Sequence, residues 1–113
     1  MSLALKAMFE PVRPLGFAAI GAAYVGVGTS LNFPARIILI QNMTDAILMF
    51  SFDGINDHFP LLANAFLLVD LSSNKTLSTG YFIAKGERLY VRDMGTAPTT
   101  GSVYFTTIYG IDY

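Results

Sequence analysis

The chain has no cysteine and a single histidine, His58, among its 113 residues. The absence of cysteine excludes disulfides, thiolate metal sites and thiol nucleophiles, so stability must come from packing. A serine nucleophile would need a histidine base and an orienting acid, yet no serine lies in a GxSxG elbow. The sequence therefore predicts a protein that is not an enzyme and has no cofactor.

Charge is also scarce. Only 13% of the residues are charged, whereas a soluble domain usually carries about 25%. Seven basic and eight acidic residues leave a net charge of −1 without runs of either sign, which argues against a nucleic-acid partner. So few charges cannot cover a monomer's exterior well, and we expect a homo-oligomer in which protein covers part of it.

Residues 15–35 carry no charge, which raises the question of a membrane helix or a signal peptide. Four glycines and several hydroxyl and amide residues dilute the hydrophobicity of this span. The segment before it mixes Lys6 and Arg13 with Glu10 rather than being purely basic. Neither a membrane helix nor a signal peptide is favoured.

Residues 36–54 form two apolar runs around a polar turn, and neither run alternates between apolar and polar positions. The pattern predicts strands at residues 36–41 and 46–52, joined at residues 42–45 as the central hairpin of the fold. A strand with one wet face should alternate, so both strands are expected to be covered on both faces. A neighbouring subunit or the N-terminal arm could supply that cover.

Further strands are predicted at residues 66–71, 81–84 and 102–109, with an interrupted strand within residues 15–31. Residues 88–93 alternate cleanly, so Leu89 and Val91 should face away from a wet side. Seven or eight short strands predict an all-β protein, a single antiparallel β-sandwich with a jelly roll as one form. The predicted organisation is an extended arm at residues 1–14 and one domain at residues 15–113.

Two kinds of polar segment carry residues that could bind a metal or accept a glycan. His58 lies near Asp53, Asn56 and Asp57, but the spacing matches no calcium loop, and these residues are common turn formers, so no metal is predicted. The N-glycosylation pattern occurs at Asn42 and at Asn74. Each falls where a turn is expected, and turn formation explains both asparagines.

The tyrosines offer the alternative function, a carbohydrate-binding module for adhesion to a host surface. Sugar-stacking candidates are Tyr81, Tyr90, Tyr104 and Tyr109, because a tyrosine ring with a hydroxyl suits a partly wet surface. Aromatic residues are also ordinary strand residues that fill sandwich cores. The second explanation is favoured.

Residues 36–54, AFLLVDLSSNK at residues 65–75 and GERLYVRDMGTAPTTGSVYFTTIYG at residues 86–110 resemble small structural proteins of tailed bacteriophage virions. Those proteins combine an apolar hairpin, an Asn and Asp turn, and a late strand after a Gly, Thr and Pro-rich loop. The resemblance implies a non-enzymatic virion protein repeated as capsid decoration or cement, or in the head-tail connector or collar. Its partners would be major capsid, portal or tail components.

Contacts with neighbouring proteins are expected in the N-terminal arm and in the predicted hairpin. The sequence does not separate interface from core in the hairpin. The candidate interface residues are Leu3, Leu5, Met8, Phe9, Phe33, Ile38, Ile40, Met49 and Phe52.

Overall fold

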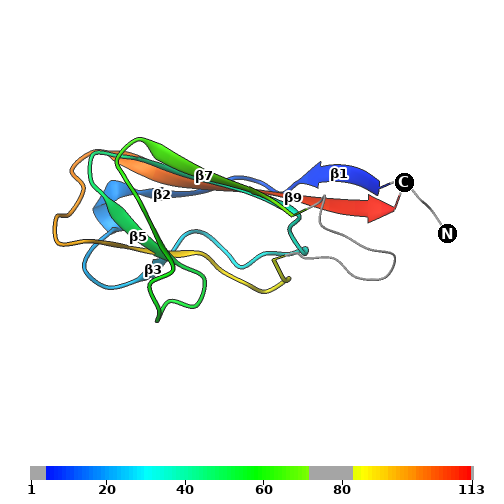
Figure 1. Ribbon diagram of the computed structural model, residues 1–113, viewed down its shortest axis with the longest axis horizontal. Coiled ribbons are helices and arrows are strands. Elements are labelled where there is room, and N and C mark those ends of the chain that lie inside the picture. The colour runs from blue at the N-terminus through cyan, green and yellow to red at the C-terminus, as the bar shows by residue number, and fades with distance from the viewer. Residues whose placement is uncertain (1–4, 72–82, 113) are drawn as a thin grey trace.

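The computed structural model describes residues 5–71 and 83–112, without the side chains of residues 5 and 112. Two antiparallel sheets pack face to face, as the predicted β-sandwich requires (Figure 1). The described residues form strands and one short 3-10 helix, η1 (Phe17–Ala19), and none of their helices is long and apolar enough to cross a membrane.

Sheet A has the order β1-β9-β4-β7, and β2 also pairs with β9. Its strands are β1 (Leu5–Phe9), β2 (Arg13–Gly16), β4 (Ile37–Thr44), β7 (Ala65–Asp70) and β9 (Gly101–Asp112). Sheet B has the order β3-β8-β5-β6. Its strands are β3 (Val25–Gly26), β5 (Leu48–Ser51), β6 (Phe59–Leu61) and β8 (Tyr90–Asp93).

The two apolar runs of residues 36–54 do not form a hairpin, and that prediction is wrong. They become β4 and β5, which lie in different sheets, so the connection crosses the sandwich instead of turning within one sheet. The single chain shows the predicted cover for one face of β4, and cover of the other face by a neighbouring subunit stays a prediction. One face of β4 lies in the core, and the other points away from sheet B.

Asn42 explains the crossing between the sheets. Its side chain is fully buried, and Nδ2 donates hydrogen bonds to the carbonyl oxygens of Ala46, Leu61 and Leu62 at 2.9, 3.0 and 3.1 Å. Its Oδ1 accepts hydrogen bonds from the backbone N–H and the hydroxyl of Thr44. One amide thus holds the end of β4, the start of the crossing and the end of β6. In the folded chain its nitrogen is not available to a glycan.

The core lies between the sheets and comes mainly from alternate residues of β4, β5, β8 and β9. Its buried hydrophobic members are Ile20, Val27, Leu31, Ala35, Ile38, Ile40, Leu48, Phe50, Leu89, Val91, Val103 and Phe105. Leu89 and Val91 are fully buried while Arg88, Tyr90 and Arg92 are partly exposed, which confirms the predicted wet side of residues 88–93.

The N-terminal segment belongs to sheet A, because both β1 and β2 pair with β9. Phe9 pairs with Ile108 and Arg13 with Phe105, so residues 10–12 oppose only residues 106 and 107. This extra residue is a β-bulge. Residues three apart in a regular strand point to opposite faces, but the bulge turns both Glu10 and Arg13 inward.

Glu10 and Arg13 form a buried ion pair, with Nη2 of Arg13 2.7 Å from Oε1 of Glu10. Arg13 also donates to the carbonyl oxygens of Thr29 and Ser30. Burial raises the pKa of Glu10, but hydrogen bonds from Arg13 and from the backbone of Asn32, together with the charge of Arg13, outweigh burial and lower that pKa overall. The pair therefore ties the bulge to the loop at residues 29–33.

Stability should depend on pH through Glu10. A lowered pKa in the folded state means that the contribution is present above pH 4.5, the ordinary value for this group, and is lost as pH falls through the folded-state pKa. We expect the difference in free energy of unfolding between the wild type and Glu10→Gln, measured in urea, to shrink as pH falls below about 4.5. A difference that stays constant from pH 7 to pH 3 would contradict this assignment.

Candidate functional site

The outer face of sheet A, which points away from sheet B, is apolar. Alternation along the strands places on it Ile37, Leu39, Gln41 and Met43 of β4, Phe66, Leu68 and Asp70 of β7, Ser102, Tyr104, Thr106 and Ile108 of β9, and Phe9 of β1. Phe9, Phe66 and Leu68 are 67%, 64% and 57% exposed. Phe66 and Leu68 are neighbours on this face of β7, and Phe9 lies across β4 and β9 at the opposite edge of the same face. Exposed apolar patches of this kind mark interaction sites.

The outer face of sheet B is polar by contrast. Arg92 forms a two-point ion pair with Asp57, with Nη2 2.8 Å from Oδ2, and Tyr24 donates to the same carboxylate. The guanidinium groups of Arg88 and Arg92 lie over the rings of Tyr90 and Tyr24. The hydrogen bond from Arg92, followed by the one from Tyr24, lowers the pKa of Asp57. The polar side chains described on this face are therefore paired with one another.

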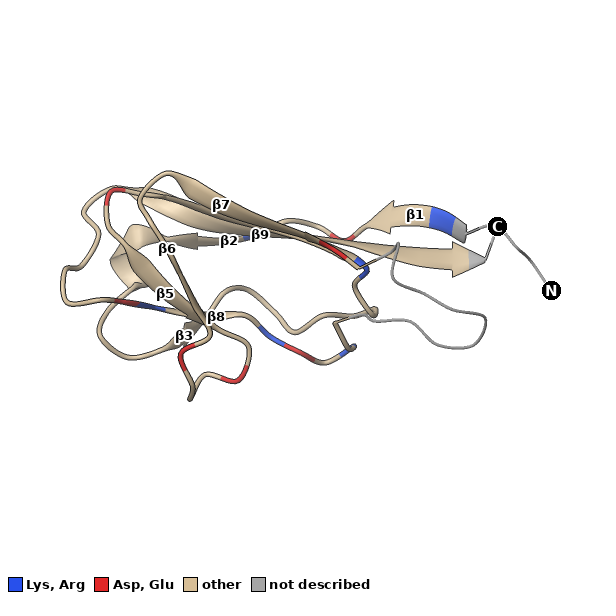
Figure 2. Cartoon of the chain, viewed as in Figure 1, with Lys and Arg blue, Asp and Glu red and all other residues tan. Residues whose placement is uncertain are grey.

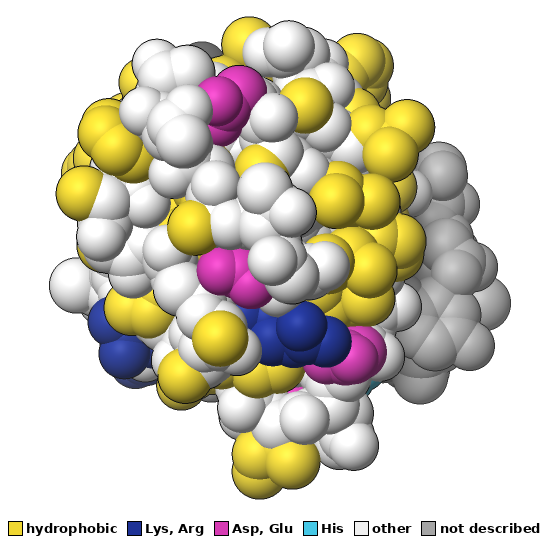
Figure 3. All heavy atoms as spheres, turned by 90° about the vertical axis from the view of Figure 1, so that its left-hand side faces the viewer, with side chains coloured by type: hydrophobic (Ala, Val, Ile, Leu, Met, Phe, Trp, Pro, Cys, Tyr) yellow, Lys and Arg dark blue, Asp and Glu magenta, His cyan; other side chains and the backbone are white. Residues whose placement is uncertain are grey.

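The distribution of charge follows the same division (Figure 2). The long strands of the upper layer, sheet A, are mostly tan with a few coloured residues, and the lower layer carries coloured residues on β8 and in its loops. Viewed from the end of the molecule opposite β1, the charged side chains are few and stand among hydrophobic and neutral ones (Figure 3).

A two-stranded ribbon extends sheet A beyond the sandwich. β4 pairs with β9 only as far as Ile108, so the last residues of β9 have β1 as their one paired neighbour among the described strands. The ribbon protrudes on the right of Figure 1 and contributes to a long axis of 51 Å against 24 and 21 Å for the others. Two-stranded ribbons are marginally stable in water. Contact with other protein would stabilise this one.

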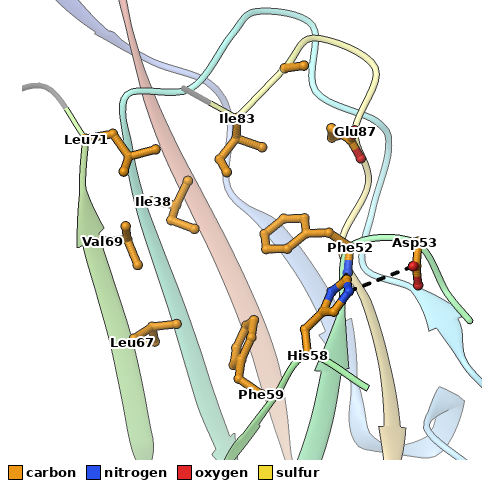
Figure 4. A pocket seen from close by; sticks show the side chains of 11 residues that line it. Ile38, Phe52, Asp53, His58, Phe59, Leu67, Val69, Leu71, Ile83 and Glu87 are labelled. Atoms are coloured by element: carbon orange, nitrogen blue, oxygen red, sulfur yellow. Dashed lines mark hydrogen bonds and ion pairs between the residues drawn. The ribbon is translucent and has the colours of Figure 1, made fainter. Parts of the chain in front are cut away.

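A cleft of about 650 Å³ opens between the sheets, beside β7. Apolar side chains from β4, β6 and β7 line one side, and Phe52, His58, Asp53 and Glu87 lie toward its other end (Figure 4). Because an imidazole and two carboxylates meet an apolar cavity here, the cleft is the place to test for acid-base chemistry.

The histidine in this cleft is already committed to the loop that carries it. The backbone N–H of Phe52 donates to Nδ1 of His58 at 3.0 Å, which occupies the one lone pair of a neutral imidazole. Its Nε2 lies 3.8 Å from Oδ2 of Asp53. A general base needs a free lone pair within reach of a substrate proton. In this geometry His58 instead closes the loop.

Asp53 organises the same loop. Its carboxylate accepts hydrogen bonds from the backbone N–H groups of Asn56 and Ile55, from the amide of Asn56 and from the buried hydroxyl of Ser51. These bonds hold its pKa well below the ordinary value. Among the described residues no group of three metal-ligating acidic or histidine side chains lies together. The geometry of Asp53 is that of a turn.

The structure distributes the candidate contact residues over several environments. Phe9 is exposed on the outer face, Met8 is half-buried in the ribbon, and Phe33 stacks on Tyr109 with ring centres 3.9 Å apart. Leu3 lies outside the described residues, and the backbone of Leu5 pairs with Asp112 in the ribbon.

The hairpin candidates divide between core and surface. Ile38 and Ile40 are 3% and 0% exposed and belong to the core. Phe52 packs against the core and lines the cleft, and Met49 is half-buried on the outer side of sheet B, opposite Arg92. The outer-face residues that sequence reasoning missed are Ile37, Leu39, Phe66 and Leu68. Along each strand they alternate with inward-facing residues, which include Ile38 in β4 and Val69 in β7. The two-residue period of a strand was therefore the available signal.

The four sugar-stacking candidates are not gathered on one surface. Tyr90 lies in sheet B beside Arg88, Tyr104 lies on the outer face of sheet A, and Tyr109 stacks on Phe33 in the ribbon. Tyr81 lies outside the described residues.

No match was found when the chain was compared with protein-family models, with curated proteins and with solved structures.

Proposed function

We propose that the chain is a non-enzymatic structural protein of a tailed-bacteriophage virion, present in symmetric copies on the capsid or in the head-tail connector region. The observation that supports this proposal is the apolar outer face of sheet A, which has no basic residue. The virion location comes from the sequence resemblance. Its partners would be further copies of the chain and major capsid, portal or tail components.

The size of the outer face suits a protein interface. At about 200 Å² for an aromatic side chain, the exposed fractions of Phe9, Phe66 and Tyr104 amount to roughly 330 Å². With the neighbouring aliphatic residues, this approaches the roughly 800 Å² that each partner contributes to a standard interface. Burying apolar area stabilises by about 25 cal/mol per Å², so docking needs no specialised residue.

The absence of basic residues from the described outer face also bears on the kind of partner. A nucleic acid or an anionic membrane would require clustered lysine and arginine, and the described outer face carries neither. A flat apolar protein surface fits most of it, because Asp70, at the end of β7, is the one charged residue among the described outer-face positions.

Leu39→Lys tests the proposal at the centre of the outer face. The introduced ammonium would be buried without a partner on docking, so binding to purified phage capsid or portal proteins should weaken at least about tenfold. The matched control is Met49→Lys, at a half-buried position on the outer side of sheet B, and its binding should change much less. Surface plasmon resonance with the full chain measures both.

A chain that binds neither capsid nor portal proteins, and is a monomer by light scattering at micromolar concentration, would overturn the proposal. Imaging the native particle decides between the two locations. A ring of copies around a channel identifies a connector, and a lattice over the shell identifies a decoration protein.

A further inference from the structure

Among the strands that the structure describes, the two at the ends of sheet A, β1 and β7, have one paired neighbour each. An edge strand offers a row of backbone N–H and C=O groups to any chain that can pair with it, and proteins usually protect such edges with charge or proline. The sequence of β7 is AFLLVD, with one charge at its end, and that of β1 is LKAMF. Neither strand contains proline.

The edge of β2 is different, although it lies on the same side of β9 as β1. Pro14 lies within β2, and Pro11 lies in the bulge between β1 and β2. Proline has no N–H to donate and is confined to edges or bulges. Pairing is therefore discouraged along β2 and remains possible along β1.

The direction of the backbone N–H groups on β7 follows from one hydrogen bond. Leu71, directly after β7, donates its N–H to the carbonyl of Arg36, next to β4, at 2.7 Å. Backbone groups alternate in direction along a strand. The N–H groups of Phe66 and Leu68 therefore point away from β4, toward the edge.

The same reasoning applies to β1. Glu10, directly after β1, donates its N–H to the carbonyl of Thr107 in β9 at 3.2 Å. By alternation, the N–H groups of Leu5, Ala7 and Phe9 point away from β9, toward the edge.

The two edges match in direction and in face. Successive strands of sheet A are antiparallel from β1 through β9 and β4 to β7, so β7 runs antiparallel to β1. In an antiparallel ladder two residues that exchange hydrogen bonds have side chains on one face. The residues whose N–H groups point to the edge lie at outer-face positions on both strands. Joining the edges therefore extends sheet A from copy to copy, with sheet B of every copy on the same side of the extended sheet.

From this match we infer that β7 of one copy pairs with β1 of a second copy, head to tail. The inference rests on the proposed assembly into copies and names the surface that joins them. Pairing Phe66 with Phe9 and Leu68 with Ala7 joins two aromatic and two aliphatic side chains. In that register Asp70 lies opposite Leu5 and Lys6 lies opposite Val69, so no two residues of like charge are paired. Head-to-tail contacts close into a ring when the rotation between copies allows it.

Two proline variants test this pairing, each with a control at the same position. Leu68→Pro removes an edge N–H of β7, and Leu68→Ala shortens the side chain but keeps that N–H. Ala7→Pro removes an edge N–H of β1, and Ala7→Ser keeps it. Masses are measured by size-exclusion chromatography with light scattering on the full chain, and folding is checked by circular dichroism.

Each proline variant should have the mass of one chain, 12.3 kDa, while both controls keep the mass of the wild-type oligomer. An equimolar mixture of the two proline variants should form a dimer of twice that mass, because each retains the edge that the other lacks. Pairing of β7 with β7 predicts instead that Ala7→Pro dimerises alone, and this result would overturn the inference.

Unchanged oligomers of both folded proline variants would also overturn the inference but would leave the proposed function standing, since copies would then meet through another surface. A wild-type monomer that still binds capsid or portal proteins would have the same meaning. If a proline variant fails to fold, hydrogen exchange of the wild type decides. The amides of Phe66, Leu68, Ala7 and Phe9 should exchange at least tenfold more slowly in the oligomer than after dilution to monomer, and equal rates would refute the pairing.

Discussion

Replacing Arg13 by methionine is expected to lower the free energy of unfolding by about 3–5 kcal/mol, the range for removing one member of a buried ion pair. The side chains of Arg13 and Glu10 are only 6% and 2% exposed. Without Arg13, the carboxylate of Glu10 keeps the backbone N–H groups of Asn32 and Phe33 and the amide of Asn32 as donors. These neutral donors do not balance a buried charge.

Urea unfolding followed by circular dichroism measures this effect. Arg92→Met is the matched control, because Arg92 also pairs with a carboxylate, that of Asp57, but this pair is much more exposed. Exposed ion pairs contribute about 0–1 kcal/mol. Adding Glu10→Gln to Arg13→Met should recover part of the loss, since the unpaired charge is then gone. Equal losses for Arg13→Met and Arg92→Met would show that the buried pair does not stabilise the bulge.

Asn42→Asp is expected to have an effect of similar size, about 3–5 kcal/mol at pH 7. The change removes the Nδ2 donor that serves the carbonyls of Ala46, Leu61 and Leu62. It also places a carboxylate against those three oxygen atoms in a fully buried position. The crossing between the two sheets would lose the group that fixes it.

The pH dependence identifies the cause of this second effect. Burial and the neighbouring carbonyls should raise the pKa of the introduced carboxyl above about 3.9, the value expected in the unfolded chain. A raised pKa means that stability is lost as pH rises from about 4 through the folded-state pKa, so the variant should be most stable in acid relative to the wild type.

Asn64→Asp is the control for this prediction. The chemical change is the same, but Asn64 is exposed in the turn before β7 with φ of 61°, a conformation that asparagine and aspartate both tolerate. The free energy of unfolding of the Asn64→Asp variant should stay within about 0.5 kcal/mol of the wild-type value. If Asn42→Asp behaved in the same way at all pH values, the amide would have no special part in the crossing.

Asn42 and the Glu10–Arg13 pair show where sequence reasoning ended. The sequence pattern predicts a hairpin turn at Asn42, because a polar residue between two apolar runs is typical of such a turn. Whether two consecutive strands pair or cross to opposite sheets depends on partners distant in sequence, here the carbonyls of Leu61 and Leu62. Glu10 and Arg13 looked like ordinary charges of an arm, since only the bulge opposite residues 106 and 107 places both in the core.

The sequence by itself determined the all-β class, the strands around residues 66–71, 88–93 and 102–109, and the shortage of charge that predicted cover by other protein. These follow from local residue preference and from composition, which do not depend on the fold. Tertiary structure decided which apolar residues form the core and which remain outside. Ile38 and Leu39 are both apolar neighbours in one strand, and only the position of sheet B buries the first and leaves the second on the outer face of sheet A.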